Sequence, residues 1–162
     1  MIIRPATHDD HAAIWTVLEP IIRAGETYAL PRDMAFDAAI AFWLAPGNDG
    51  FVAEDAGAVV GTYFLHENQR GGGAHVANCG YATAVTAQGR GVARAMCAHS
   101  LDHARARGFR AMQFNIVVST NERAVRLWQA MGFAIVGRLP GAFAHPTLGD
   151  VDAFVMFQSL GR

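Results

Sequence analysis

The sequence has few of the features that mark secreted, membrane-spanning or nucleic-acid-binding proteins. Its two cysteines, Cys79 and Cys97, lack the paired spacing of a disulfide framework or a zinc site. No run approaches the ~20 consecutive apolar residues that cross a bilayer, and the amino terminus shows no apolar core of signal-peptide length. A net charge of −1 supplies no general attraction for nucleic acid or anionic membranes. We therefore expect a cytoplasmic protein without nucleic-acid or membrane partners.

The composition does supply enough apolar material for one buried core. Hydrophobic residues make up 52% of the chain and charged residues 17%, which is typical of a globular protein. At 162 residues the chain is long enough for one core and too short for two ordinary domains. We expect a single domain over residues 1–162.

Hydrophobic periodicity and turn residues predict an α/β fold with a mixed sheet. Gly25 and Gly108 are expected to end the first and third helices, and Asp33 to cap the second. Trp15, Phe42 and Trp43 fall at helical spacing and are expected in the core. The predicted order is a strand at 1–5, helices at 11–24 and 34–44, two strands within 51–67, a strand within 74–85, a helix at 90–107, a strand at 109–118, a helix within 119–133, and strands at 134–139 and 151–157 around a loop at 140–150.

The segment TAQGRGVARAM, residues 86–96, places two glycines and an arginine just before a predicted helix. The first N–H groups of a helix are unpaired and carry partial positive charge, so they can bind an anion. Gly89 and Gly91 would let a phosphate approach the backbone, and Arg90 and Arg94 would add charged contacts. The same glycines could instead only permit a tight strand-to-helix turn. Neither the Rossmann fingerprint nor the P-loop is matched.

Two motifs together resemble those of the GNAT acyltransferase superfamily. QGRGVA fits the pattern Gln/Arg-x-x-Gly-x-Gly/Ala, and NERAVRLWQAMGF is similar to the second signature of that family. The residues that carry the match are Gln88, Gly91, Ala93, Asn121, Ala124, Leu127, Gly132 and Phe133. The chain looks most similar to phosphinothricin-type and amino-acid N-acetyltransferases. The resemblance implies the GNAT fold, a mixed and mostly antiparallel sheet of about six to seven strands with about four helices, splayed between its two central strands.

The resemblance also implies acetyl-CoA as cosubstrate and no metal. The pyrophosphate would lie on the backbone amides of residues 89–93, and the pantetheine would pair with the strand end at 83–85. Backbone amides near Thr83 would polarise the thioester carbonyl. Asn121 is a candidate contact to the pantetheine, or an N-cap. The expected cofactor-binding residues are Thr83, Ala84, Val85, Gln88, Gly89, Arg90, Gly91, Val92, Ala93, Arg94, Asn121 and Trp128.

Two positions depart from the family pattern. Trp128 replaces the tyrosine that commonly protonates the leaving thiolate, and an indole cannot usefully give up a proton. Solvent or another donor must then serve, with Trp128 lining the groove. Asn78 stands where phosphinothricin-type enzymes commonly carry a glutamate base. Asn78 can orient the amine by hydrogen bonds, or it is a structural strand residue.

Candidates for a base and for the acceptor site come from the remaining polar residues. Glu26 and His145 are candidate catalytic groups, since an amine must lose a proton before it attacks. Tyr28, Asn78 and Asp152 are candidate substrate contacts, and His75 is a further possible base. His99 and His103, one turn apart on a helix, have no acidic or cysteine ligand placed nearby, so no metal site is expected.

The sequence thus predicts an acetyl-CoA-dependent N-acetyltransferase in which a small amine, an amino acid or an analogue, attacks the thioester directly. One alternative is acetylation of a protein amino terminus or lysine. Another is a CoA-binding regulatory domain without turnover. A homodimer through the apolar last strand is a further possibility.

Overall fold

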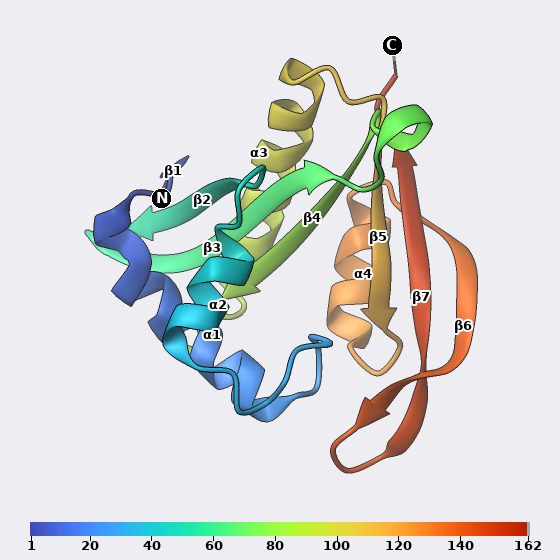
Figure 1. Ribbon diagram of the computed structural model, residues 1–162, viewed down its shortest axis with the longest axis horizontal. Coiled ribbons are helices and arrows are strands. Elements are labelled where there is room, and N and C mark those ends of the chain that lie inside the picture. The colour runs from blue at the N-terminus through green and yellow to red at the C-terminus, as the bar shows by residue number, and fades with distance from the viewer. Residues whose placement is uncertain (162) are drawn as a thin grey trace.

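A seven-stranded sheet in the order β1-β2-β3-β4-β5-β7-β6 organises the computed structural model, which describes residues 1–161 (Figure 1). The strands are β1 (Ile2–Pro5), β2 (Asp49–Asp55), β3 (Ala58–Glu67), β4 (Val76–Thr83), β5 (Ala111–Val118), β6 (Ala134–His145) and β7 (Gly149–Ser159). The helices are α1 (His11–Ala24), α2 (Phe36–Trp43), α3 (Val92–Ala106) and α4 (Glu122–Ala130), with 3-10 turns η1 (His8–Asp10), η2 (Gly71–Gly73) and η3 (Val85–Ala87). The predicted fold class and element order are confirmed.

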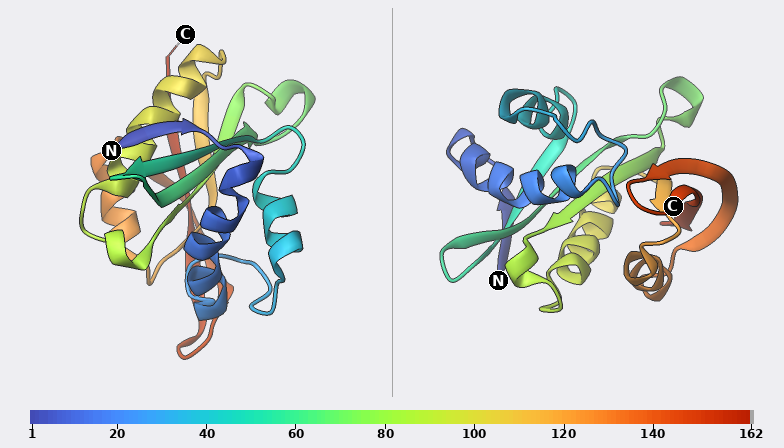
Figure 2. Two further views of the ribbon diagram at one scale, coloured as in Figure 1. Left: turned by 90° about the vertical axis from the view of Figure 1, so that its left-hand side faces the viewer. Right: turned by 90° about the horizontal axis from the view of Figure 1, so that it is seen from below.

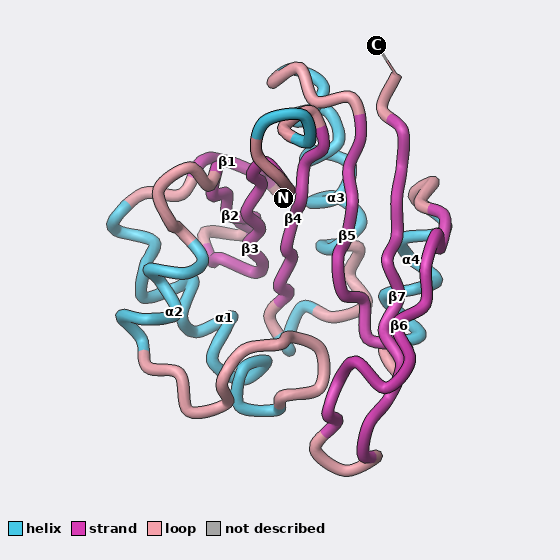
Figure 3. The backbone as a smooth tube through the Cα atoms, turned by 45° about the vertical axis from the view of Figure 1, so that its right-hand side comes forward, coloured by secondary structure: helices cyan, strands magenta, loops and turns pink. Residues whose placement is uncertain are grey.

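The sheet is antiparallel except between its two central strands. β4 and β5 run parallel and pair only at Val76 with Ala111 and at Ala77 with Met112. Beyond these two pairs the strands diverge, as Figures 1 and 3 show. An irregularity in the pairing of β5 with β7, between Phe114 and Val117, accompanies this divergence. The sheet is therefore splayed, as the sequence resemblance implies.

Helices cover both faces of the sheet, with a separate buried cluster beneath each pair (Figure 2). On the α1/α2 face, α1 buries Ile14, Val17, Leu18 and Ile22, a spacing that places one stripe of the helix against the sheet. On the other face, α3 buries residues such as Met96 and packs against β3 and β4. No helix within residues 1–161 is both long and apolar enough to span a membrane.

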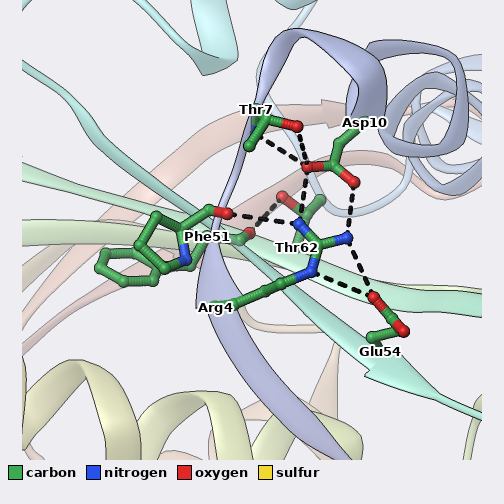
Figure 4. A network of polar contacts seen from close by, with 7 residues as sticks. Arg4, Thr7, Asp10, Phe51, Glu54 and Thr62 are labelled. Atoms are coloured by element: carbon green, nitrogen blue, oxygen red, sulfur yellow. Dashed lines mark hydrogen bonds and ion pairs between the residues drawn. The ribbon is translucent and has the colours of Figure 1, made fainter. Parts of the chain in front are cut away.

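Arg4 joins the first strand to the start of the first helix and to β2. Its guanidinium donates two hydrogen bonds of 2.8 Å to the Asp10 carboxylate and one of 3.0 Å to Glu54 (Figure 4). The backbone N–H and the hydroxyl of Thr7 also donate to Asp10. The guanidinium and these hydrogen bonds hold the pKa of the buried Asp10 carboxyl well below its usual range.

Three local predictions differ from the structure. α2 begins at Phe36 with Ala35 as its N-cap, so Asp33 does not cap it. Trp43 is fully buried, but Phe42 is 43% exposed and does not belong to the core. Residues 140–150 are not a loop, because β6 continues to His145 and β7 begins at Gly149. Strand pairing along this hairpin extends both strands beyond their apolar runs.

Replacing Asp10 by asparagine removes the carboxylate that Arg4 and Thr7 share. We expect Asp10→Asn to lower the free energy of unfolding at neutral pH by about 2 kcal/mol, because hydrogen bonds to a buried charge are lost. Since the Asp10 pKa is depressed in the folded state, its stabilisation is present above the unfolded pKa and is lost as pH falls below ~4. Urea unfolding at several pH values should therefore show the gap between wild type and variant narrowing in acid.

Asp102→Asn is the matched control, since the Asp102 carboxylate is 82% exposed and, within residues 1–161, pairs only with Arg105 on the same helix. It should change stability by less than ~0.5 kcal/mol. A pH-independent gap for Asp10→Asn would contradict the ion-pair explanation.

Candidate functional site

A cavity of about 730 Å³ lies where β4 and β5 part. Its walls come from the segment between α1 and α2, from α2, β3, β4 and β5, from the turn before α3, and from α4. Of the residues predicted from sequence, those lining it are Tyr28, Asn78, Thr83, Gln88, Gly89, Gly91, Val92, Ala93, Arg94, Asn121 and Trp128. The fold thus gathers most of the predicted site into one place.

The edge of β4 that faces this cavity has backbone groups free for pairing. Ala84 N–H donates to Val60 O and Asn68 N–H donates to Val76 O, so the even-numbered residues of β4 bond to β3. Because a strand alternates its bonding direction, the N–H and C=O groups of Cys79, Tyr81 and Thr83 point towards the gap. An extended ligand could therefore pair with β4 as an additional strand.

The turn before α3 presents a group of unpaired N–H donors. Gly89 and Gly91 both have φ of +81°, a conformation that favours glycine. Within residues 1–161, no acceptor lies in hydrogen-bond range of the N–H groups of residue 89 or of residues 91–94. A Cβ added at Gly91 would meet no atom within 4 Å, so a ligand can approach the backbone closely there. This is the geometry of an anion site at a helix N-terminus.

Two arginines flank this turn, and one of them was missed from the sequence. Arg94 and Arg123 both line the cavity, and Nη2 of Arg123 lies 3.6 Å from the position of a Cβ built on Gly89. Arg123 follows Asn121 in the second motif, but only the packing of α4 beside the turn brings it to the site. Arg90 instead forms an ion pair with Asp55 and does not line the cavity.

Asn78 lies at the point where the two central strands separate. Ala77 is the last residue of β4 that pairs with β5. At the next position, the side-chain Nδ2 of Asn78 donates to the backbone O of Gln113 on β5 at 2.9 Å. Its amide thus bridges the strands at the first position where their backbones no longer pair. Asn78 is half-buried and lines the cavity.

Tyr28 reaches the free edge of β4 from the segment after α1. Its hydroxyl donates to the carbonyl O of Tyr81 at 2.7 Å, and burial raises the pKa of the phenol, so Tyr28 is a donor here. The absence of a side chain at Gly80 permits this approach, because a Cβ there would lie 3.1 Å from the Tyr28 hydroxyl.

Trp128 and Asn121 connect α4 to the cavity. Trp128 is 8% exposed, and its ring lies 4.9 Å from that of Tyr81 and 5.2 Å from that of Phe114, measured between centroids. Trp128 therefore packs in the groove wall. Oδ1 of Asn121 accepts a hydrogen bond from Ala124 N–H at 3.3 Å, so Asn121 caps α4 while also lining the cavity.

Sequence and structure comparisons identify relatives of the chain. The model of the Acetyltransferase (GNAT) family matches residues 9–133. The chain belongs to this family. A GCN5-related N-acetyltransferase from Kribbella flavida is 42% identical, with a TM-score of 0.93 over 98% of this chain and 96% of that one. Membership confirms the family and the acyltransferase class indicated by the two motifs.

One more distant relative of this GNAT chain agrees with it in fold, and another matches part of its sequence. The structure of yncA from Salmonella typhimurium, with its cofactor acetyl-CoA, is 23% identical, with a TM-score of 0.87 over 100% of this chain and 95% of that one. N-acetyltransferase aca1 of Schizosaccharomyces pombe is 28% identical over 101 residues. That match covers 60% of this chain and 47% of aca1, about half of its length.

Several site residues predicted from the sequence lie outside this cavity. Glu26 is exposed, and His145 ends β6, where its Nδ1 accepts from Thr147 N–H at 3.3 Å. Asp152 accepts from Gly141 N–H at 2.9 Å and pairs with Arg138, contacts that lower its pKa and tie β7 to β6. Of the site residues predicted from the sequence, those that do not line the cavity are Glu26, His75, Ala84, Val85, Arg90, His145 and Asp152.

The two histidines on α3 are engaged with other groups. Nδ1 of His99 lies 2.6 Å from the Tyr63 hydroxyl, and Nε2 of His103 lies 2.8 Å from Asp49. Within residues 1–161 no three His, Cys, Asp or Glu side chains are grouped to hold a metal ion.

Gly91→Val should weaken acetyl-CoA binding, because the β-branched side chain would cover the unpaired N–H groups. We expect the dissociation constant to rise at least tenfold, or ~1.4 kcal/mol, by calorimetry. Gly108→Val is the matched control: Gly108 follows the other end of α3, has φ of +83°, and likewise has no atom within 4 Å of an added Cβ. Both variants carry backbone strain. Equal losses of acetyl-CoA affinity in the two variants would therefore show that strain, and not the covering of the N–H groups, weakens binding.

Arg123→Met tests whether the positive charge of Arg123, which the sequence analysis missed, contributes to acetyl-CoA binding. We expect a several-fold loss of acetyl-CoA affinity that shrinks as salt concentration rises, since screening weakens exposed charge interactions. Arg126→Met is the control, because Arg126 lies on the same helix, pairs with Glu122 and does not line the cavity. A loss independent of salt, or shared by both variants, would argue against an electrostatic role.

Proposed function

We propose that this GNAT chain, acting as a single domain, transfers the acetyl group of acetyl-CoA to a small amine, an amino acid or an analogue of the phosphinothricin type. The observation that carries the proposal is the continuity of the cavity. It joins the free edge of β4 to the unpaired N–H groups and arginines at the start of α3.

The residues present fit acetyl-CoA in both charge and backbone chemistry. The N–H groups of residue 89 and residues 91–94, with Arg94 and Arg123, would hold the pyrophosphate. The backbone groups of Cys79, Tyr81 and Thr83 that face the gap would pair with the amides of the pantetheine arm. When bound, acetyl-CoA supplies an acetyl group activated as a thioester.

The chemistry of the chain favours direct attack by the amine. A backbone N–H on the free edge of β4 would stabilise the negative charge that develops on the carbonyl oxygen. Asn78 and Tyr28 would orient the acceptor by neutral hydrogen bonds. Cys79 lines the cavity, but burial raises the pKa of its thiol, so it stays protonated and is a poor nucleophile. No covalent enzyme intermediate is required.

Departure of the thiolate needs no acidic side chain in this site. Trp128 replaces the usual tyrosine and can only donate a hydrogen bond. A thiol with a pKa of ~8.5 leaves tolerably as a thiolate, and water can protonate it.

A CoA-binding domain without turnover is a second candidate, favoured by one observation. Within residues 1–161, no Asp, Glu or His side chain lines the cavity, so no ordinary general base is present there. Binding of acetyl-CoA without consumption by any amine would support this candidate.

Release of free CoA thiol from acetyl-CoA, measured across amino acids, their analogues and polyamines, tests the proposed transfer. We expect turnover with one chemical class, with products identified by mass. Asn78→Ala should lower kcat/KM for the amine at least tenfold, or ~1.4 kcal/mol, because the bridging amide is lost. Its acetyl-CoA dissociation constant should stay within twofold of wild type. Unchanged turnover in this variant would remove Asn78 from the mechanism.

A further inference from the structure

The part of the cavity on the α1/α2 face has an apolar and aromatic wall, formed by Tyr28, Leu30, Phe42 and Phe64. We refer to this region as the acceptor half. Phe42 is 43% exposed, although it is a large apolar side chain. Because Phe42 lines the cavity, its ring is available to a ligand there.

The aromatic wall is held in place by packing behind it. The Phe42 ring lies edge-on to Phe64 with centroids 6.0 Å apart, and Phe64 lies edge-on to the buried Trp43 at 4.8 Å. Gly80 makes room for this arrangement, since a Cβ there would lie 2.6 Å from Cε1 of Phe64. The wall is therefore a built surface that can receive a flat or apolar group.

The polar side chains that line the cavity include two neutral amides, whereas His66, whose ring stacks on Phe64 with centroids 5.6 Å apart, does not line it. Asn78 donates to Gln113 O, while Asn115 accepts from the Gln113 side chain at 2.9 Å and donates to Asn68 at 2.7 Å. Asn78 and Asn115 both line the cavity. The charged side chains among the lining residues are Arg94 and Arg123, which flank the turn before α3.

This distribution of charge disfavours a cationic acceptor. An ammonium group that entered the acceptor half would lose hydration, and within residues 1–161 no carboxylate lines the cavity to compensate for that loss. An uncharged amine avoids this cost and can bond to the amide side chains of Asn78 and Asn115.

We infer that the acceptor is an amine that is uncharged at neutral pH and carries an aromatic or apolar body, such as an arylamine. The inference rests on the proposed acetyl transfer to a small amine and assigns that amine to a class other than amino acids, so that amino acids and alkylamines become the competing outcomes.

The reaction balances without a general base in the protein. The lone pair of the neutral nitrogen attacks the thioester carbon, the new N–C bond forms, and the C–S bond breaks. The nitrogen loses one proton to water, and the departing sulfur gains one from water. The products are the N-aryl acetamide and CoA thiol. Because water takes and supplies the protons, this reaction is compatible with a cavity wall that, within residues 1–161, holds no Asp, Glu or His side chain.

Two isomeric amines test the inference, 4-ethylaniline and 2-phenylethylamine, with L-phenylalanine as a third substrate. The first is uncharged at neutral pH and the second is protonated, although they contain the same atoms. We expect kcat/KM for 4-ethylaniline to exceed that of the other two at least tenfold. Equal or faster acetylation of 2-phenylethylamine or phenylalanine would overturn the inference and leave the proposed function intact.

Calorimetric titration of the same amines into the CoA-loaded protein provides a readout independent of turnover. Tighter binding of 4-ethylaniline than of its isomer supports the inference, and equal or weaker binding overturns it. If no amine releases CoA thiol, the proposed acetyl transfer to amines fails, and this titration still decides the charge preference of the cavity.

Phe42→Glu places a carboxylate on the exposed part of the wall. We expect it to reverse the order, raising kcat/KM for 2-phenylethylamine and lowering that for 4-ethylaniline, each about fivefold. Phe36→Glu is the matched control, since Phe36 lies on the same helix, is 37% exposed and does not line the cavity. A similar reversal in both variants would show a general charge effect and overturn the placement of the acceptor against Phe42.

Discussion

The short parallel pairing between β4 and β5 is the constraint on which the site depends. Two residue pairs join the backbones of the central strands, and beyond them each backbone pairs only with its outer neighbour within residues 1–161. A continuous ladder would consume the backbone groups of Cys79, Tyr81 and Thr83. Because the ladder stops at Ala77, no strand pairs with those groups, and the space beside them becomes the cavity.

The cavity assigns different physical chemistry to its two regions. Near α3, unpaired N–H groups and two arginines suit an anionic ligand. On the α1/α2 face, aromatic rings and amide side chains suit a neutral one. Asn78 and Tyr28 each donate a side-chain hydrogen bond to a backbone carbonyl of a central strand, Asn78 to Gln113 and Tyr28 to Tyr81. The gap between β4 and β5 thus brings an anionic ligand and a neutral ligand together at the free edge of β4.

Local signals predicted the elements better than they predicted the residues around the site. Glycines with positive φ ended α1 at Gly25 and introduced α3 at Gly91, and the two motifs identified the family. Asp33 failed as a cap because α2 begins three residues later. Residues 140–150 failed as a loop because pairing with β7, a long-range interaction, extends β6 to His145.

The sequence by itself determined the order of elements, the glycine turn before α3 and the family, since each depends on neighbouring residues whose periodicity or spacing is visible in one segment. Only the tertiary structure decided which side chains share the cavity. Arg90 pairs with Asp55 and lies outside the cavity, whereas Arg123 of α4 lies beside the glycine turn. Phe42 is not buried in the core but lines the acceptor half. These outcomes depend on the packing of elements distant in the chain, because burial and charge pairing are properties of the assembled fold and are not encoded in the local pattern.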